Sequence, residues 1–592
     1  MPLKSKNSSD PSSPKDKAIE MSSQPKPMFY AAIALVVVGL LGFAFWRLGG
    51  NSEGTETAQN SPELSKEEMD KLKTHAEDPN QTGDLTTVKE YSFVPGEKLP
   101  EVKGVSDYKA LDKNNTVKFS INVWAGWAPI IHANQGFKPG KVWKTPAGKE
   151  FKVELVLIDD PVAMRDAFAA GNIHVGWATV DMLPLFLESL QKDSRAMPRV
   201  YQQVDWSNGG DGIVVREDIK TMSDLKGKTV VLAQNSPSQF FLLNALINAG
   251  IQPSQVKFKY TADAFQAAAA FNADTSIAGV VSWAPDIYKL SEAPGNRMLV
   301  TTLTANKLIA DVWYARADFA KDHPDICEGL VRGIFDSMEA LKADGEQGKV
   351  ADWMGAGYSM PSAEAKGMLA DAHSTNYAEN RDFFLNQNNP TNFERTYDNA
   401  FFLYNKIGVT DNKVPFDQIV DFSIVQALGK EKKYAEQQND YQVRFTPTTA
   451  AVIQAESTEI LTKTVVIRFA PNKWDLHWMV VRDGEQMLYD MDADAVVEEV
   501  SKLAGQYGAA RIVIEGHTDS SMKGKIPGDH VKELALNRAN SVKEELVNKY
   551  ELAPNQFATS GMGWDRPADP NDPMNQTKNR RVEIKVYPLE AN

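Results

Sequence analysis

Ile512-Val513-Ile514-Glu515-Gly516-His517-Thr518-Asp519 decides the fold of the C-terminal part of the chain. Its apolar run predicts a short buried strand that ends in a polar turn at Thr518-Asp519. Leu534-Ala535-Leu536-Asn537-Arg538-Ala539-Asn540-Ser541-Val542 follows a Gly-Asp-His sequence and predicts a helix. Asn579-Arg580-Arg581-Val582-Glu583-Ile584 closes this region. We expect the strand and the helix to bring distant residues together into one binding site.

A positive charge lies within the apolar stripe of the predicted helix. Arg538 falls on the same side as the residues that helical spacing places toward the core, which are Val531, Leu534, Ala535, Val542 and Leu546. A guanidinium in that position needs a partner, because burying an unpaired charge is costly. Asp519 is one candidate, which would make a plain internal ion pair. A ligand carboxylate is the other, and Asp519 would then be available to an ammonium group.

The three stretches together resemble the OmpA-like and MotB-like peptidoglycan-binding domain, over about 457–588. This resemblance implies that Asp519 and Arg538 hold the diaminopimelate of the cell-wall stem peptide without covalent chemistry. It implies that Thr518, Leu534 and Arg581 are neighbours in the same site. The chain departs from the family pattern where Val531 replaces a usual Asn, where Ala535 replaces a usual Ser, and in the longer loop 522–529.

Length and composition restrict the class of protein. The 592 residues predict about three folded units. With 78 acidic and 64 basic residues the net charge is −14, and no basic patch with interleaved aromatic residues appears, so we expect no nucleic-acid partner. The eight histidines have no metal-ligand spacing, so we predict no metal and no cofactor. The single cysteine, Cys327, is expected to be a buried apolar residue of a helix.

An uncharged apolar run near the N-terminus predicts a membrane span. Met28 to Trp46 is long enough to cross the roughly 30 Å hydrocarbon layer as a helix. Lysines precede it and an acidic segment follows it, so the N-terminus is predicted to be cytoplasmic and the rest periplasmic. A cleaved signal peptide is the alternative, although no small-residue cleavage site follows the run. The run carries no charge, which disfavours an ion-driven motor function of the MotB kind.

The middle of the chain alternates short β-rich runs with amphipathic helical ones, which predicts an α/β fold. In such sheets ligands bind beyond the carboxyl ends of the strands, so the turns there are the candidate site. The strands are expected at 117–123, 153–158, 229–232 and 278–283, with helices at 160–170, 239–250 and 263–273.

The turns after these strands resemble those of the periplasmic solute-binding proteins of the nitrate, sulfonate, taurine and thiamine-precursor group, the two-lobed type II fold. The motifs are Trp124-Ala125-Gly126-Trp127-Ala128-Pro129, Gly176-Trp177-Ala178-Thr179, Gln234-Asn235-Ser236-Pro237-Ser238-Gln239 and Ser282-Trp283-Ala284-Pro285-Asp286. The resemblance covers about 116–435. It implies a cleft between one lobe of early and late segments and another of about 212–304, with hinge closure on a small ligand.

Two kinds of ligand are compatible with these turns. Ser236 and Ser238 at a helix N-terminus could hold an anion. However, the turns contain almost no Arg or Lys, whereas tryptophans lie close in sequence to aspartates, which favours a cationic or zwitterionic solute. Core packing of the tryptophans and helix capping by the aspartates are the alternatives. The candidate solute-binding residues are Trp127, Trp177, Thr179, Ser236, Ser238, Trp283 and Asp286.

These observations predict a single-pass protein of the bacterial inner membrane with two binding modules and no catalysis, because no acid–base pair or activated nucleophile stands out. It would capture a small solute and bind peptidoglycan, with a partner protein in the membrane as a further expectation. The alternative is a structural envelope tether whose solute-binding fold is a spacer. The expected parts are a disordered tail 1–27, a transmembrane helix 28–47, a linker 48–115, a solute-binding domain 116–436, a linker 437–456 and an α+β OmpA-like domain 457–592.

Overall fold

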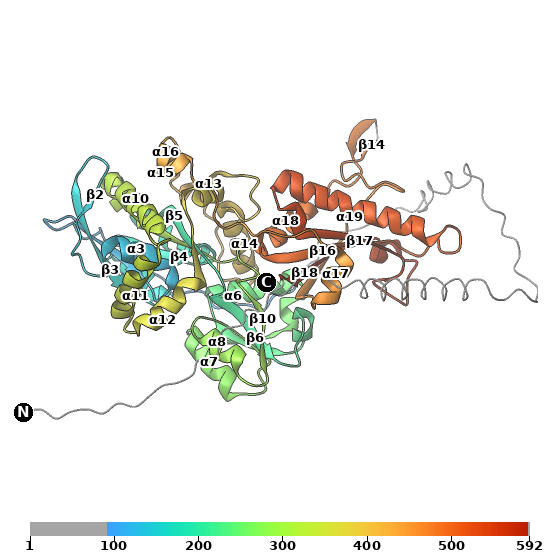
Figure 1. Ribbon diagram of the computed structural model, residues 1–592, viewed down its shortest axis with the longest axis horizontal. Helices are drawn as coiled ribbons and strands as arrows, with labels where there is room; N and C mark the ends of the chain where they lie inside the picture. The colour runs from blue at the N-terminus through green and yellow to red at the C-terminus, as the bar shows by residue number, and fades with distance from the viewer. Residues whose placement is uncertain (1–90, 483, 590–592) are drawn as a thin grey trace, which may run out of the picture. The chain divides into compact units, whose positions relative to one another are not determined.

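A computed structural model describes residues 91–482 and 484–589 (Figure 1). The predicted tail 1–27 and membrane span 28–47 lie outside these residues, as does the predicted linker up to residue 90. Within the described ranges, no helix combines the length and the apolarity needed to cross a bilayer.

The first lobe is built on a seven-stranded sheet of order β12-β5-β11-β4-β1-β3-β2. β1 pairs in parallel with β3 and β4, and β11 runs antiparallel to β4 and β5. The central strands are buried on both faces, which explains their nearly continuous apolar runs. The strands are β1 (Thr116–Ile121), β2 (Trp143–Lys144), β3 (Glu150–Leu157), β4 (Val175–Thr179), β5 (Pro198–Ser207), β11 (Ala310–Arg316) and β12 (Ala372–Ser374).

Helices from both the early and the late parts of the chain complete the first lobe. Figure 1 shows α3, α10 and α11 gathered beside β3, and α3 contacts both α10 and α11. Cys327 is fully buried on α10, as predicted. The helices are α3 (Ala128–Asn134), α4 (Pro161–Ala169), α5 (Leu183–Leu190), α9 (Ala317–Asp322), α10 (Pro324–Ala340), α11 (Asp344–Tyr358), α12 (Ser362–Met368), α13 (Tyr377–Leu385), α14 (Phe393–Lys406), α15 (Ser423–Leu428) and α16 (Lys432–Ala435).

The second lobe has its own five-stranded sheet, of order β10-β6-β9-β7-β8. The chain enters this lobe after β5 and leaves it before β11, so two segments, 208–210 and 302–309, cross between the lobes. The sheet spans Asp211 to Thr301, close to the predicted 212–304. Its elements are β6 (Asp211–Arg216), β7 (Thr229–Ala233), α6 (Pro237–Asn248), β8 (Lys257–Thr261), α7 (Ala264–Ala273), β9 (Gly279–Trp283), α8 (Asp286–Glu292) and β10 (Asn296–Thr301).

The end of the first predicted linker is packed rather than free. Gly96 N donates to Ile407 O at 2.8 Å and Ser106 N to Ala169 O at 3.1 Å. Two guanidiniums of the first lobe, both fully buried, take carbonyl acceptors from the same segment: Arg165 donates to Pro100 O at 2.6 Å and Arg316 to Ser106 O at 2.8 Å. Because buried N–H donors need acceptors, residues 96–106 belong to the solute-binding domain, and the predicted linker 48–115 is too long.

The second predicted linker, 437–456, is also structured. Tyr441 donates to Asn208 Oδ1 at 2.7 Å, and Asn376 Nδ2 donates to Gln438 O at 2.7 Å, so its first residues pack on the first lobe. Its last residues form α17 (Ala450–Glu456), which belongs to the C-terminal domain. α17 buries Ala450 and Ile453 against the sheet of this domain. The domain therefore begins before the predicted boundary at residue 457.

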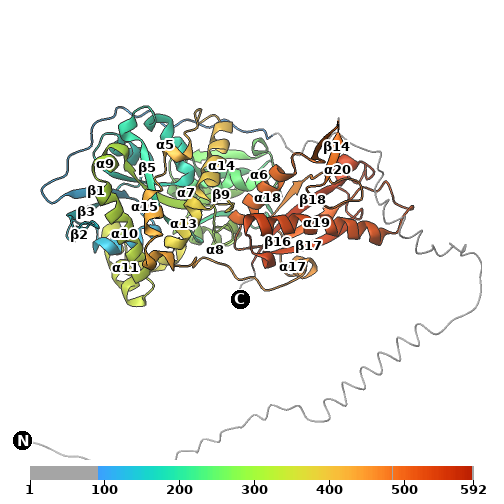
Figure 2. The same ribbon diagram turned by 90° about the horizontal axis from the view of Figure 1, so that it is seen from above.

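The C-terminal domain has a four-stranded sheet of order β13-β18-β16-β17, with β16 and β17 parallel and β18 antiparallel to β16. Alternate residues of β16 face opposite layers: Val513 packs with α17, whereas Ile512 and Ile514 join the main core. Figures 1 and 2 show α19 running along β16 and β17. The elements are β13 (Leu461–Val465), β14 (Met479–Arg482), β15 (Glu485–Leu488), α18 (Ala493–Gln506), β16 (Ala510–His517), α19 (Gly528–Tyr550), β17 (Phe557–Gly563), α20 (Gln576–Asn579) and β18 (Arg581–Pro588).

The helix predicted around Arg538 is α19, and its buried face contains Arg538 together with the expected apolar residues. The Gly-Asp-His sequence is its first turn rather than a segment before it. Two glycines let α19 approach the sheet closely. A Cβ at Gly516 would lie 2.0 Å from Ala535 O, and one at Gly561 would lie 2.1 Å from Lys532 O. Backbone-to-backbone contact therefore fixes the height of Arg538 above β16.

Replacing Gly516 by Ala is expected to destabilise the C-terminal domain by roughly 1–3 kcal/mol, because the added methyl group meets main chain that cannot move aside locally. Denaturant unfolding of the full chain measures this loss. Gly528→Ala is the matched control, since its Cβ would meet nothing nearer than 3.5 Å. Equal stability of Gly516→Ala and the control would contradict the close packing.

Candidate functional site

A cavity of about 400 Å³ lies between the two sheets, at the ends of their strands. The first lobe lines it with residues that follow β1 and β3, among them Trp124 and Asp159, and with Thr179, the last residue of β4. The second lobe contributes Asn235 after β7 and Trp283 at the end of β9. The cavity thus has the position that ligand sites take in open α/β sheets.

Four of the seven residues predicted to bind the solute line this cavity: Trp177, Thr179, Ser236 and Trp283. They come from both lobes, so the fold brings together what the sequence separates. Trp177 is oriented by its indole N–H, which donates to Ile158 O at 3.1 Å. Ser236 precedes α6 and donates to Ala233 O at 2.8 Å.

The other three predicted residues are not among those that line this cavity. Trp127 is fully buried in the core, where it packs edge-on against Phe119 and donates to Asn122 Oδ1 at 2.6 Å. Ser238 is buried within α6. Asp286 is the first residue of α8 and does not reach the cavity lining. Trp124, three residues before Trp127, takes the place predicted for that ring.

Asp211 and Asp311 are two of the aspartates that lie close in sequence to tryptophans, and the sequence analysis did not include them in the site. Both line the cavity, at the start of β6 and near the start of β11. These strands run antiparallel to their neighbours, so their first residues lie at the same sheet edge as the last residues of β9 and β4. Asp211 is the cross-strand partner of Trp283, and Asp311 that of Thr179. The sequence patterns did not reveal that β6 pairs antiparallel with β9 and β11 with β4, and this pairing is what brings the two aspartates to the cavity.

Four carboxyl groups are buried in and beside the cavity. Asp181, Asp205, Asp211 and Asp311 are each at most 5 % exposed. Burial raises the pKa of Asp181 and of Asp211 to about 7, because the charged form loses its hydration. Ser207 Oγ donates to Asp211 Oδ2 at 2.7 Å and opposes part of that shift.

Asp205 and Asp311 form a closely coupled pair across β5 and β11. Burial raises the pKa of both, and the neighbouring charge of Asp205 further raises the pKa of Asp311. The indole N–H of Trp124 lies 3.3 Å from each oxygen of Asp205 and favours its ionised form. The pair therefore holds a proton more firmly than separate aspartates would.

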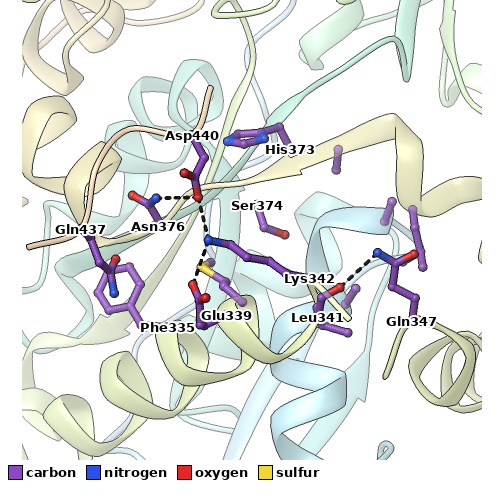
Figure 3. A pocket seen from close by; sticks show the side chains of 15 residues that line it. Phe335, Glu339, Leu341, Lys342, Gln347, His373, Ser374, Asn376, Gln437 and Asp440 are labelled. Carbon is purple, nitrogen blue, oxygen red and sulfur yellow. Dashed lines mark hydrogen bonds and ion pairs between the residues drawn. The ribbon is translucent and has the colours of Figure 1, made fainter. Parts of the chain in front are cut away.

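A second cavity, of about 280 Å³, lies on the first lobe beside residues 437–440 (Figure 3). Its charged groups are already paired: Lys342 Nζ lies 2.8 Å from both Asp440 Oδ2 and Glu339 Oε2. Asn376 Nδ2 also donates to Asp440, and Gln347 donates to Leu341 O. These bonds hold residues 437–440 on the first lobe, so we assign this cavity a structural role.

Asp519 and Arg538, the predicted binding pair of the C-terminal domain, each bond to other residues. Asp519, two residues beyond β16, accepts from Arg580 Nε at 2.5 Å and from Ser521 N at 2.8 Å. Arg538 donates to Lys473 O at 3.0 Å and lies over the Phe469 ring at 5.0 Å. Asp519 and Arg538 are each 4 % exposed. Sequence reasoning passed over Arg580, although the Asn-Arg-Arg motif contains it.

The three predicted neighbours of this pair are buried as well. Thr518 donates its backbone N–H to Gly563 O at 2.8 Å, and its hydroxyl has no hydrogen-bond partner within the described residues. Leu534 packs on α19 with Ile526. Arg581 is held by Glu583 at 2.6 Å and by Arg566 O at 3.0 Å, which directs it to the sheet.

Glu515, His517 and Glu583 also come close together, in a metal-like grouping. Lys585 Nζ lies 3.0 Å from Glu515 Oε2 and 3.7 Å from Glu583 Oε2, so an ammonium already supplies the positive charge. Burial raises the pKa of Glu515, but His517 and Lys585 outweigh it and lower the pKa to about 2. The cluster is accordingly a structural ion network.

The fold and the cavity define a two-lobed solute-binding protein that carries an additional α+β domain. Comparison with family models supports both parts: residues 151–347 match the NMT1/THI5 like family and residues 483–581 the OmpA family. One segment of the chain thus matches a family of periplasmic binding domains and a C-terminal segment matches the OmpA family, and both matches are to non-enzymatic binding families.

Individual relatives match each part separately. Outer membrane protein Omp38 of Acinetobacter baumannii is 34% identical over 137 residues, which are 23% of this chain and 34% of Omp38. The taurine-binding periplasmic protein of Escherichia coli K12 is 26% identical over 190 residues, 31% of this chain and 56% of that protein. The chain thus spans about a third and about half of these two relatives.

Among solved structures, the periplasmic aliphatic sulphonate binding protein SsuA from Escherichia coli covers 52% of this chain and 99% of its own length, with 18% identity and a TM-score of 0.41. The nitrate-binding protein NrtA from Synechocystis PCC 6803 covers 52% and 92%, with 14% identity and a TM-score of 0.36.

Asp211→Asn is expected to stabilise the ligand-free protein at pH 8. The folded-state pKa of about 7 exceeds the unfolded value near 3.9, so folded Asp211 binds more protons than unfolded Asp211 between these values, and its contribution to stability falls as pH rises through that window. Removing the charge should raise the free energy of unfolding by roughly 1–4 kcal/mol at pH 8 and change it little at pH 4. Denaturant unfolding at the two pH values measures the difference.

Asp112→Asn is the control for this experiment. The pKa of Asp112 is lowered, chiefly because its carboxylate accepts the Thr116 N–H, so that substitution should not stabilise the protein at pH 8. A destabilised Asp211→Asn at pH 8 would mean that Asp211 already has a compensating positive charge.

Proposed function

We propose that this protein is an envelope receptor that binds a small solute between its lobes and binds peptidoglycan non-covalently through its C-terminal domain. The observation that carries the proposal is the presence, in one chain, of a solute-binding domain with a cavity between its lobes and of an OmpA domain. The two parts would keep the receptor close to the cell wall.

The buried charges of the C-terminal domain support the peptidoglycan part. A diaminopimelate centre carries an ammonium and a carboxylate, which Asp519 and Arg538 would hold. Arg580 now bonds Asp519, so an arriving ammonium would replace that guanidinium, and the carboxylate would replace the carbonyl contacts of Arg538. Each charge-assisted hydrogen bond contributes about 1.5–3 kcal/mol.

Asp519→Ala and Arg538→Ala are each expected to weaken co-sedimentation with purified cell-wall sacculi by roughly 10- to 100-fold, since each removes one charge-assisted contact. Asp565→Ala and Lys532→Ala are the matched controls. Asp565 and Lys532 form an exposed ion pair of the same domain, so each substitution removes a charge of the same sign from its surface. Retention of binding by both Asp519→Ala and Arg538→Ala would refute this binding site.

We also propose that residues 28–47 anchor the protein in the inner membrane, on the strength of the apolar run and its flanking lysines. The full chain should stay with membranes after an alkaline wash, and a variant without residues 28–47 should be released. A variant without residues 2–20 is the control and should stay bound. Release of the full chain by the wash would contradict the anchor.

A further inference from the structure

The charged side chains among the described residues that line the cleft are all acidic. Five carboxylates face the cavity, from Asp159, Asp160, Asp211, Asp263 and Asp311. No lysine, arginine or histidine is found among the described residues that line it. The charged side chains of the cavity wall thus offer nothing to an anionic ligand.

The carboxylates differ in how far their hydrogen-bonding capacity is used. Asp160 and Asp263 cap α4 and α7, and Asp159 accepts Val123 N at 2.7 Å, so backbone N–H groups already bond these three. Asp211 and Asp311 are deeper, each 5 % exposed, and Asp211 is bonded by a neutral serine hydroxyl. These two groups are where a ligand's positive charge would be most stabilised.

A separate acceptor lines the same cavity without a partner. Asn235 is 9 % exposed and has a left-handed backbone with φ of 51°, between β7 and α6. Its Nδ2 donates to Glu97 O at 2.9 Å, which identifies Oδ1 as the acceptor, and Oδ1 has no hydrogen-bond partner among the described residues. An N–H or O–H donor of a ligand would satisfy this buried acceptor.

Aromatic rings complete the wall. Trp124 and Trp177 line the cavity from the first lobe, and Phe265 and Trp283 from the second. Ring faces attract a desolvated cation, because the quadrupole of an aromatic ring places negative charge on its face, and they offer an anion nothing comparable.

We propose that the cleft binds a small organic cation with a primary ammonium group and no acidic group, held by Asp211 and Asp311 with Asn235 Oδ1 as a further acceptor. This inference rests on the proposed solute-binding function and specifies its ligand class. A quaternary ammonium fits less well, because it has no N–H for Asn235. A zwitterion fits less well, because its acid would meet a wall of carboxylates.

The test uses the full chain and calorimetry with four probes: putrescine, choline, taurine and methanesulfonate. Putrescine should bind at least tenfold more tightly than choline or taurine, and methanesulfonate should not bind. Tighter binding of taurine or methanesulfonate than of putrescine would overturn the inference while preserving a solute-binding function. No binding by any of these probes, or by a wider set of amines and acids, would count against both.

Asp211→Asn and Asp311→Asn should each weaken putrescine binding at least tenfold. Both variants keep the side-chain volume, and the unfolding experiment on Asp211→Asn shows separately whether that variant is folded. Asp218→Asn removes an exposed carboxylate of the same lobe and should bind like the wild type. Unchanged binding by both Asp211→Asn and Asp311→Asn would overturn the assignment.

Discussion

The carboxyl groups buried in and beside the cavity between the two lobes are the constraint on which the solute-binding domain depends. Asp181, Asp205, Asp211 and Asp311 are taken out of water, and the described residues lining the cavity supply no positive charge. Burying such groups lowers the free energy of unfolding of the ligand-free protein. Natural proteins keep destabilising groups of this kind mainly at functional sites, where a ligand can compensate them. The cleft is thus prepared for binding at the expense of folding.

The same charges lie where the chain crosses between the lobes. Asp211 follows the first crossing segment directly, and Asp311 follows the second. Thr302 links Asp211 to both crossing segments, because its hydroxyl contacts Ser207 Oγ at 2.8 Å and accepts Gly209 N at 2.9 Å and Asp211 N at 3.1 Å. A ligand that neutralised Asp211 and Asp311 would therefore act beside the segments that join the two lobes.

The C-terminal domain handles buried charge differently. Asp519 has Arg580 at 2.5 Å, and Arg538 has backbone carbonyls and an aromatic face. The charges of its proposed site are therefore compensated in the ligand-free protein, and a ligand would have to exchange with existing bonds. Exchange of this kind favours selectivity over affinity, since only a group that matches both charges and geometry recovers what is lost.

The sequence by itself determined the elements and the domain types. Period-two and helical patterns located β7, β9, α4, α6 and α7 to within a few residues, because burial of one face imposes those periods locally. The buried position of Arg538 on α19 also followed from helical spacing. The packing of 96–106 and 437–441 on the first lobe did not, because polar segments without periodicity show no local sign of the carbonyl and side-chain contacts that hold them.

Only the tertiary structure decided which residues share a site. Whether Trp124 or Trp127 lines the cavity depends on a turn of three residues, and Asp211 and Asp311 enter it because β6 and β11 run antiparallel to their neighbours. Likewise Asp519 pairs with Arg580, 61 residues away. Strand direction and long-range pairing are set by the whole sheet, so no local pattern in the chain could have specified them.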